Sequence, residues 1–391
     1  MLYWLLDISR NWLDGVGLYS YLQILDRLTF RALAAAMLAF AAVLVFGKPV
    51  IAWLQRKKIG DSGLTDAAGL AAAANSKKNV PTMGGILIVG AIIGSTVLLA
   101  DIRNFYILLG LVVLVWLAVL GGVDDWLKLT AARRPTASRQ GLLAWEKLVF
   151  QIGLGLLVGY FAWQHGRAPG APVNLAHVLN LPLQKTFESS SGAIADGLWY
   201  LTLGGFTFVA VVMITGMSNA VNITDGMDGL AAGTMGIVSL GLLVLAFIAG
   251  WQQAAQYLLV PYVTESQELA VMVGATAGAC VGFLWFNCLP ARVFMGDTGA
   301  LALGGLLGYV ALIIRQEVIV IFMSAIFAIE TASVAMQVGY FKATRGKRIF
   351  KCAPYHHHLH MSGWTEGQVV TRFWIITVLL VVIGLASIKV R

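Results

Sequence analysis

Ten long apolar stretches constrain the fold of this chain more than any other feature of its sequence. A segment of about 20 mostly apolar residues is long enough to cross a bilayer as a helix. Because only helices and closed barrels satisfy their own backbone in lipid, we predict an all-α polytopic membrane protein with about ten transmembrane helices. The stretches lie at 32–53, 82–100, 104–123, 148–164, 198–220, 229–250, 269–286, 299–314, 318–340 and 371–388.

The composition excludes the soluble classes. Only 12% of the residues are charged and 59% are hydrophobic, whereas soluble domains average about 25% charged residues. The three cysteines, Cys280, Cys288 and Cys352, form neither a metal-binding nor a disulfide pattern. We therefore predict neither a soluble enzyme nor a disordered chain, and we treat 1–391 as a single membrane domain.

The distribution of Lys and Arg predicts the orientation of the chain. An even number of spans places both termini on one side, so the loops form two sets. The loops of one set contain only four Lys or Arg residues, which are Arg103, Arg167, Lys185 and Arg315. The other set holds most of the loop cations and comprises 54–81, 124–147, 221–228, 287–298 and 341–370. By the positive-inside rule this second set is cytoplasmic and both termini are periplasmic. The net charge of +8 then reflects topology, and we predict no nucleic-acid partner.

Two further segments lie outside the predicted spans. Residues 1–26 mix charged side chains with Trp4 and Trp12, which predicts an uncleaved interfacial segment. Residues 165–197 contain several prolines and form the longest periplasmic loop, which we expect to be irregular.

Five aspartates lie at the cytoplasmic ends of the predicted spans. Asp124 and Asp125 close the third stretch, Asp225 and Asp228 follow the fifth, and Asp297 precedes the eighth. Acids at membrane depth are costly and mark function. Adjacent aspartates repel unless a proton or cation intervenes, and Mg²⁺ prefers such oxygen ligands. The pattern indicates a magnesium site, and the alternative is simple solvation of helix ends.

Residues near these acids are suited to a nucleotide. Asn222, Asp225 and Asp228 are spaced three apart, so on a helix they share a face, and Gly226 lets backbone approach a ligand. The alternative is a helix cap and turn.

Lysines and a hydroxyl accompany the acids. Lys77 precedes Thr82 in PTMGG, and Lys128 and Lys147 flank the aspartate pair. Such groups hold phosphate oxygens, although positive-inside anchoring also explains each lysine taken alone.

Four of the six histidines lie together near the C-terminus. His356, His357 and His358 are consecutive, and His360 follows. Consecutive histidines cannot all face one way on a helix, but alternate pairs in an extended loop could bind a metal. Since neither a Cys partner nor an HExxH motif is present, we favour hydrogen bonding to a phosphate or sugar over structural zinc.

Five ordered motifs together closely resemble the MraY family, the phospho-N-acetylmuramoyl-pentapeptide transferases within the polytopic polyprenyl-phosphate phosphosugar transferases. The resemblance spans nearly the whole chain. The motifs are PTMGG at 81–85, VDDWLK at 123–128, NAVNITDGMDGLA at 219–231, WFNCLPARVFMGDTG at 285–299 and PYHHHLHMSGW at 354–364.

The resemblance implies a reaction and its location. It implies Mg²⁺-dependent transfer of phospho-N-acetylmuramoyl-pentapeptide from UDP-MurNAc-pentapeptide to undecaprenyl phosphate, which gives lipid I and UMP. This is the first membrane step of peptidoglycan synthesis, at the cytoplasmic face of the bacterial inner membrane. The resemblance also points to a homodimer.

Roles for individual residues follow from the same resemblance. Asp297 is expected to bind the metal, with Asp124 and Asp125 as further metal or base groups. His356, His357 and His358 are expected to act on the sugar and pyrophosphate. The expected substrate contacts are Lys77, Thr82, Lys128 and Lys147 at phosphate, and Asn222, Asp225, Gly226, Asp228, Asn287 and Phe294 at the nucleoside. We favour direct attack by the lipid phosphate over a phosphoenzyme, because that phosphate is already a nucleophile.

Two rival functions remain at this stage. A related N-acetylhexosamine-1-phosphate transferase would differ mainly in the histidine segment. A cation-coupled transporter would need acids near the bilayer midplane. Glu330, in the ninth stretch, has no assigned role and either pairs with a polar group between helices or lines a lipid groove.

Overall fold

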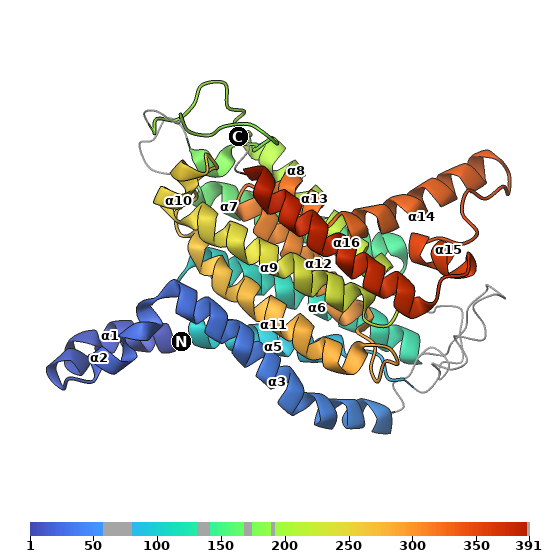
Figure 1. Ribbon diagram of the computed structural model, residues 1–391, viewed down its shortest axis with the longest axis horizontal. Helices are drawn as coiled ribbons and strands as arrows, with labels where there is room; N and C mark the ends of the chain where they lie inside the picture. The colour runs from blue at the N-terminus through green and yellow to red at the C-terminus, as the bar shows by residue number, and fades with distance from the viewer. Residues whose placement is uncertain (58–79, 131–140, 168–173, 189–191, 389–391) are drawn as a thin grey trace.

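The chain folds into a bundle of long helices (Figure 1). A computed structural model describes residues 1–57, 80–130, 141–167, 174–188 and 192–388. These residues contain two isolated β-bridges and no β-strand. The predicted all-α class is therefore confirmed.

Every predicted apolar stretch overlaps a helix. The long helices are α3 (Leu28–Arg56), α5 (Gly85–Leu99), α6 (Phe105–Thr130), α7 (Ala144–His165), α8 (Leu203–Thr224), α9 (Leu230–Gly250), α11 (Leu269–Asn287), α12 (Gly296–Ile313), α14 (Ala325–Ala343) and α16 (Glu366–Ser387). The short ones are α1 (Leu2–Gly15), α2 (Tyr19–Leu22), η1 (Gln23–Asp26), η4 (Leu175–His177), α10 (Gln252–Tyr257), η5 (Ser266–Glu268), α13 (Glu317–Met323) and α15 (Tyr355–Met361).

Within the described residues, eight helices are long and apolar enough to cross a membrane. The second predicted span, α5, has only 15 residues, fewer than the roughly 20 that a bilayer requires. The ninth is divided into α13 and α14, which are bent by 82°. A multi-pass membrane protein is thus supported, while the count of ten spans and the side on which the termini lie stay predictions.

Helix α12 forms the centre of the bundle. All of its residues from Asp297 to Ile313 are buried, and α6 and α8 pack along it. By contrast, the outer helices α3, α7 and α16 bury only 28–33% of their most apolar segments, because their remaining apolar side chains face outward, as in a membrane. The central position of α12 brings Asp297 into contact with neighbouring helices.

Helix α14 leaves the bundle at the bend (Figure 1). The Ser324 hydroxyl lies at the bend and donates to the Val320 carbonyl at 2.6 Å. Serine side chains that bond back to the preceding turn often bend helices. The bend directs α14 toward α15, which it contacts.

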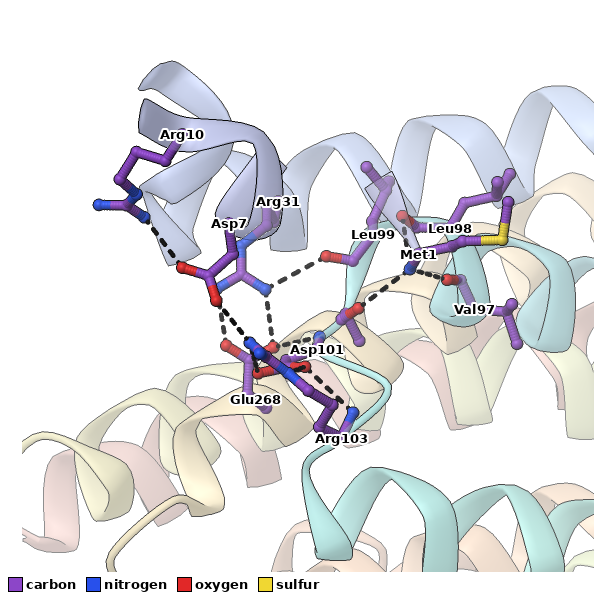
Figure 2. Close-up of polar contacts among 11 residues, drawn as sticks. Met1, Asp7, Arg10, Arg31, Val97, Leu98, Leu99, Asp101, Arg103 and Glu268 are labelled. Atoms are coloured by element: carbon purple, nitrogen blue, oxygen red, sulfur yellow. Dashed lines mark hydrogen bonds and ion pairs between the residues drawn. The ribbon is translucent and has the colours of Figure 1, made fainter. Parts of the chain in front are cut away.

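The N-terminal segment lies at the end of the bundle opposite Asp297. Here Arg31 of α3 forms a two-pronged ion pair with Glu268, at 2.6 and 2.7 Å (Figure 2). Glu268 also accepts from the Asp101 backbone at 3.0 Å, and Arg103 bonds both Asp101 and Asp7. These contacts fasten α1, the end of α5 and the start of α11 together. The predicted interfacial segment 1–26 is therefore helical and anchored, and its place at a membrane surface stays a prediction.

The described part of the predicted periplasmic loop 165–197 is irregular, as expected. It holds η4 and the bridges Val178↔Tyr200 and Phe187↔Ile194. His177 within it is buried against the Trp163 ring, and burial lowers the pKa of this imidazole.

Candidate active site

Three carboxylates from two helices meet where α6 ends and α12 begins. Asp124 and Asp125 lie in the last two turns of α6, and Asp297 is the second residue of α12. All three are buried. Each offers an oxygen within 4.8 Å of the others, a spacing that could hold a metal ion. Sequence positions about 170 residues apart are thus brought together as predicted.

Two lysines bridge the carboxylates. Lys147, in the first turn of α7, contacts Asp124 at 2.8 Å and Asp297 at 2.6 Å. Lys128 contacts the same two acids at 2.7 and 3.2 Å. With three carboxylates and two ammonium groups, the cluster carries a formal charge of −1. The lysines are held by these acids, so membrane-surface anchoring alone does not describe them.

Asp125 differs from the other two acids in its partners. Its oxygens accept from the backbone of Asp297 at 3.1 Å and from the backbone and hydroxyl of Thr298 at 3.0 and 2.7 Å. The first N–H groups of a helix lack partners within the helix and favour negative charge. Asp125 therefore fixes the start of α12, which sets the position of Asp297.

The predicted PTMGG turn lies beside the start of α12. Phe294 donates its backbone N–H to Pro81, while Gly84 and Gly85 donate to Phe294 and Met295, each at 2.8 Å. This pairing brings Thr82 and the half-buried Phe294 to the edge of the acid cluster.

Asp225 ends α8 next to the same cluster. Burial and the nearby carboxylates of Asp297 and Asp125 raise the pKa of Asp225 to about 7, against a hydrogen bond from the Gly296 backbone that lowers it. Asn222 lies one turn earlier in α8. The NxxDGxDG motif thus adjoins the acids, although its side chains do not all face one way.

The other polar residues of this turn have structural partners. Asp228 accepts from the Ala291 backbone at 2.9 Å, and its own N–H donates to Glu366 at 2.8 Å. Asn287 accepts from Gly229 at 3.1 Å and donates to the Val293 carbonyl at 2.8 Å. The contacts of Asp228 match the cap-and-turn alternative, and together with Asn287 at the end of α11 they hold the loop before α12 in place.

The histidine run forms the short helix α15, not the extended loop that we considered. His356 is buried, whereas His357 and His358 are half-buried. His358 stacks on Tyr355 and accepts from the Lys351 backbone at 3.1 Å. His356 instead points toward the DG turn: its Nε2 lies 2.5 Å from where a Cβ on Gly226 would be. The rings of His356 and His358 thus have different partners, and in the described part of the chain only the aspartates form a metal-ligand group.

Comparison with known proteins identifies the family. Residues 106–315 match the model of glycosyl transferase family 4. Proteins named phospho-N-acetylmuramoyl-pentapeptide-transferase match over all 391 residues and their own full length: 42% identity in Neisseria gonorrhoeae, 41% in Neisseria meningitidis serogroup C and 40% in Desulfotalea psychrophila. The chain belongs to the phospho-N-acetylmuramoyl-pentapeptide-transferase family. The resemblance read from the five motifs is therefore confirmed.

The arrangement fits a divalent cation in this member of the transferase family. Oxygen donors of Asp124 and Asp297 suit a hard cation, and the net negative charge of the cluster favours one. Asp124 Oδ2 is buried between the two lysines. A cation held by these acids would free both lysines to bind other anions.

The structure brings together most, but not all, of the expected site residues of this transferase-family chain. Lys77 lies outside the described residues. Sequence reasoning left two roles open for Glu330, which bonds His356 in the structure, and it missed Thr298, which bonds Asp125. It also missed Gly121, where a Cβ would lie 2.2 Å from the Asp297 carbonyl oxygen. The GG pair before the two aspartates was the available signal for this close approach.

Proposed function

We propose that this chain transfers phospho-N-acetylmuramoyl-pentapeptide from UDP-MurNAc-pentapeptide to undecaprenyl phosphate, giving lipid I and UMP. The observation that carries the proposal is the buried cluster of three carboxylates and two lysines in a chain of this family. Two anions must meet in such a reaction, and preorganised opposite charge lowers that barrier.

We assign Mg²⁺ to Asp297 and Asp124. When bound, the ion would neutralise phosphate charge as a Lewis acid. Asp125 keeps the start of α12 fixed through Thr298, so that Asp297 presents its carboxylate at one position. This role makes Asp125 a positioning residue more than a ligand.

The lysines bind the phosphates in this scheme. Lys128 is 45% exposed at its side chain, so it can follow an incoming substrate, whereas Lys147 is 16% exposed and stays between the acids. An oxygen of the lipid phosphate attacks the phosphorus attached to the sugar. The bond from that phosphorus to the oxygen shared with the uridine phosphate breaks, and UMP leaves with that oxygen.

Several of the other expected residues also receive roles. We assign the uridine to the turn at Asn222, Asp225 and Gly226, with Phe294 as a stacking partner. His356 faces this turn and is assigned to the pyrophosphate. Lys77 and Thr82 are assigned to phosphate on the basis of the motif alone.

We assign the lipid substrate to an open surface pocket beside α14. It has a volume of about 360 Å³ and is lined by apolar side chains, including Val334, Val338 and Phe341. Lys342 and Arg348 also line it. An apolar chain with an anionic headgroup matches this lining.

The assay for the proposal uses the purified full chain in detergent with undecaprenyl phosphate. We expect lipid-linked product and UMP from UDP-MurNAc-pentapeptide, loss of turnover with EDTA and recovery with Mg²⁺. Product from UDP-N-acetylglucosamine alone would instead establish the hexosamine alternative. Product that forms undiminished in EDTA would contradict the metal assignment.

We place the site at the cytoplasmic face of the bacterial inner membrane. Single cysteines introduced near Arg348 should react with an impermeant maleimide only after the membrane is opened. Labelling of intact cells at this position would contradict the orientation. A homodimer stays a prediction.

A further inference from the structure

Glu330 is a fully buried carboxylate that lies against the histidine helix. It belongs to α14, beyond the bend, and is 0% exposed. The His356 backbone donates to its two oxygens at 3.1 and 3.3 Å, and His356 Nδ1 lies 3.0 Å from Oε2. Glu330 therefore holds both the backbone and the ring of one residue.

Charge balance decides which ring nitrogen of His356 carries a proton toward the site. An isolated buried charge is costly, so a closed pair is most stable when its net charge is zero. With an ionised carboxylate, the ring is doubly protonated and Nε2 carries hydrogen. With a protonated carboxyl, that group donates to Nδ1, and the ring proton again lies on Nε2. Both neutral pairs thus make Nε2 a hydrogen-bond donor.

The Nε2 atom is placed to use that proton on a ligand. It is buried and has no hydrogen-bond partner in the described structure. It faces Gly226, where an added Cβ would lie 2.5 Å away. Gly226 directly follows Asp225, whose carboxylate interacts with that of Asp297. An unpartnered buried donor beside the acid cluster is suited to an anionic oxygen.

We propose that Glu330 is a positioning residue of the transferase site: it orients His356 and makes its Nε2 a hydrogen-bond donor to the diphosphate of the nucleotide-linked substrate. This inference rests on the proposed function and deepens it. It resolves the role of Glu330 in favour of a polar partner between helices. It also predicts that His356 and His358 have different roles. The Nδ1 of His358 accepts a hydrogen bond from a backbone N–H, whereas the Nδ1 of His356 contacts a carboxylate.

The test compares the binding of UDP and uridine by calorimetry, with the full chain in detergent at fixed Mg²⁺. Glu330→Gln keeps the size of the side chain but replaces one of its two accepting oxygens by an NH₂ group, which cannot accept from the His356 backbone. Because a hydrogen bond that holds His356 in place is lost, we expect UDP affinity to fall about 10-fold and uridine affinity to change less than about twofold. Equal losses for both ligands, or no loss, would overturn the proposal.

A double variant separates orientation from general stability. If Glu330 acts through His356, Glu330→Gln should weaken UDP binding no further once His356→Gln is present. A full additional loss in the double variant would contradict that route. Should Glu330→Gln fail to fold, Glu330→Asp replaces it, with a smaller loss expected for UDP and none for uridine.

Glu317 provides a matched control. It is a buried glutamate at the start of the same bent helix pair, 2.8 Å from Arg315. Glu317→Gln should leave both affinities unchanged, and a selective loss of UDP there would refute the specificity claimed for Glu330. Binding requires no turnover, so failure of the proposed function can be distinguished from failure of this inference. A wild-type chain that binds neither ligand contradicts the proposed function. Normal wild-type binding together with unchanged binding by Glu330→Gln contradicts only this inference.

Discussion

A single methyl group at Gly121 should disable the site, while the same change at the next residue should not. A Cβ on Gly121 would lie 2.2 Å from the Asp297 carbonyl oxygen and 2.6 Å from the Thr298 nitrogen. Both atoms are backbone, so no side chain can move aside. On Gly122 the nearest atom is the Thr298 hydroxyl oxygen at 3.7 Å, which is ordinary contact.

The size of the effect follows from these distances. Ordinary van der Waals contact begins at 3.4 Å. Helix α12 must therefore move away from α6 by roughly 1 Å, and a displacement of that size can lower the catalytic rate about 100-fold. The shift would stretch the 2.6 Å contact of Lys147 with Asp297 and the bonds of Asp125 with Thr298. Both substitutions replace helical glycine by alanine, so their intrinsic helix gain, about 0.5–1 kcal/mol, is the same.

The assay is the rate of lipid-linked product formation per folded protein, with thermal unfolding in detergent as the measure of folding. We expect Gly121→Ala to lose about 100-fold and Gly122→Ala to stay within about twofold. Equal rates for the two variants would refute the argument that the contact of α6 with α12 positions Asp297.

Two other predictions concern buried charges. Glu268→Gln breaks the ion pair with Arg31 and leaves a buried cation unpaired. It should therefore lower the free energy of unfolding by about 3–5 kcal/mol and lower the melting temperature. An unchanged melting temperature would show that the pair contributes no stability. The pKa of Asp225 is raised to about 7 in the folded state. At pH values just below 7 the folded chain therefore binds a proton on Asp225 that the unfolded chain does not bind. Its contribution to stability is therefore present at low pH and is lost as the pH rises through 7. In EDTA, the melting temperature of Asp225→Asn should rise relative to wild type between pH 5 and 8, and a pH-independent difference would contradict the assignment.

Hydropathy predicted the helices because crossing a bilayer fixes their length and composition. It could not predict the bend at Ser324 or the shortness of α5, since both depend on local hydrogen bonds and on where neighbouring segments begin. An extended loop was considered for the histidine run, yet the run is helical. Its first turn is held by Glu330, 26 residues earlier in the chain, and sequence spacing gives no sign of that contact.

The acid cluster was predictable in membership but not in division of labour. Asp124 and Asp125 are adjacent and chemically equal in the sequence. In the fold, Asp125 caps α12 while Asp124 contacts both lysines. Only packing distinguishes a carboxylate that fixes a helix from one that is available to a metal.

Binding of Mn²⁺, followed by electron paramagnetic resonance, tests most directly whether acids from distant parts of the chain share one cation. We predict one bound ion per wild-type chain, displaced by Mg²⁺, and none at the same concentration for Asp297→Asn. Unchanged Mn²⁺ binding in Asp297→Asn would contradict the account.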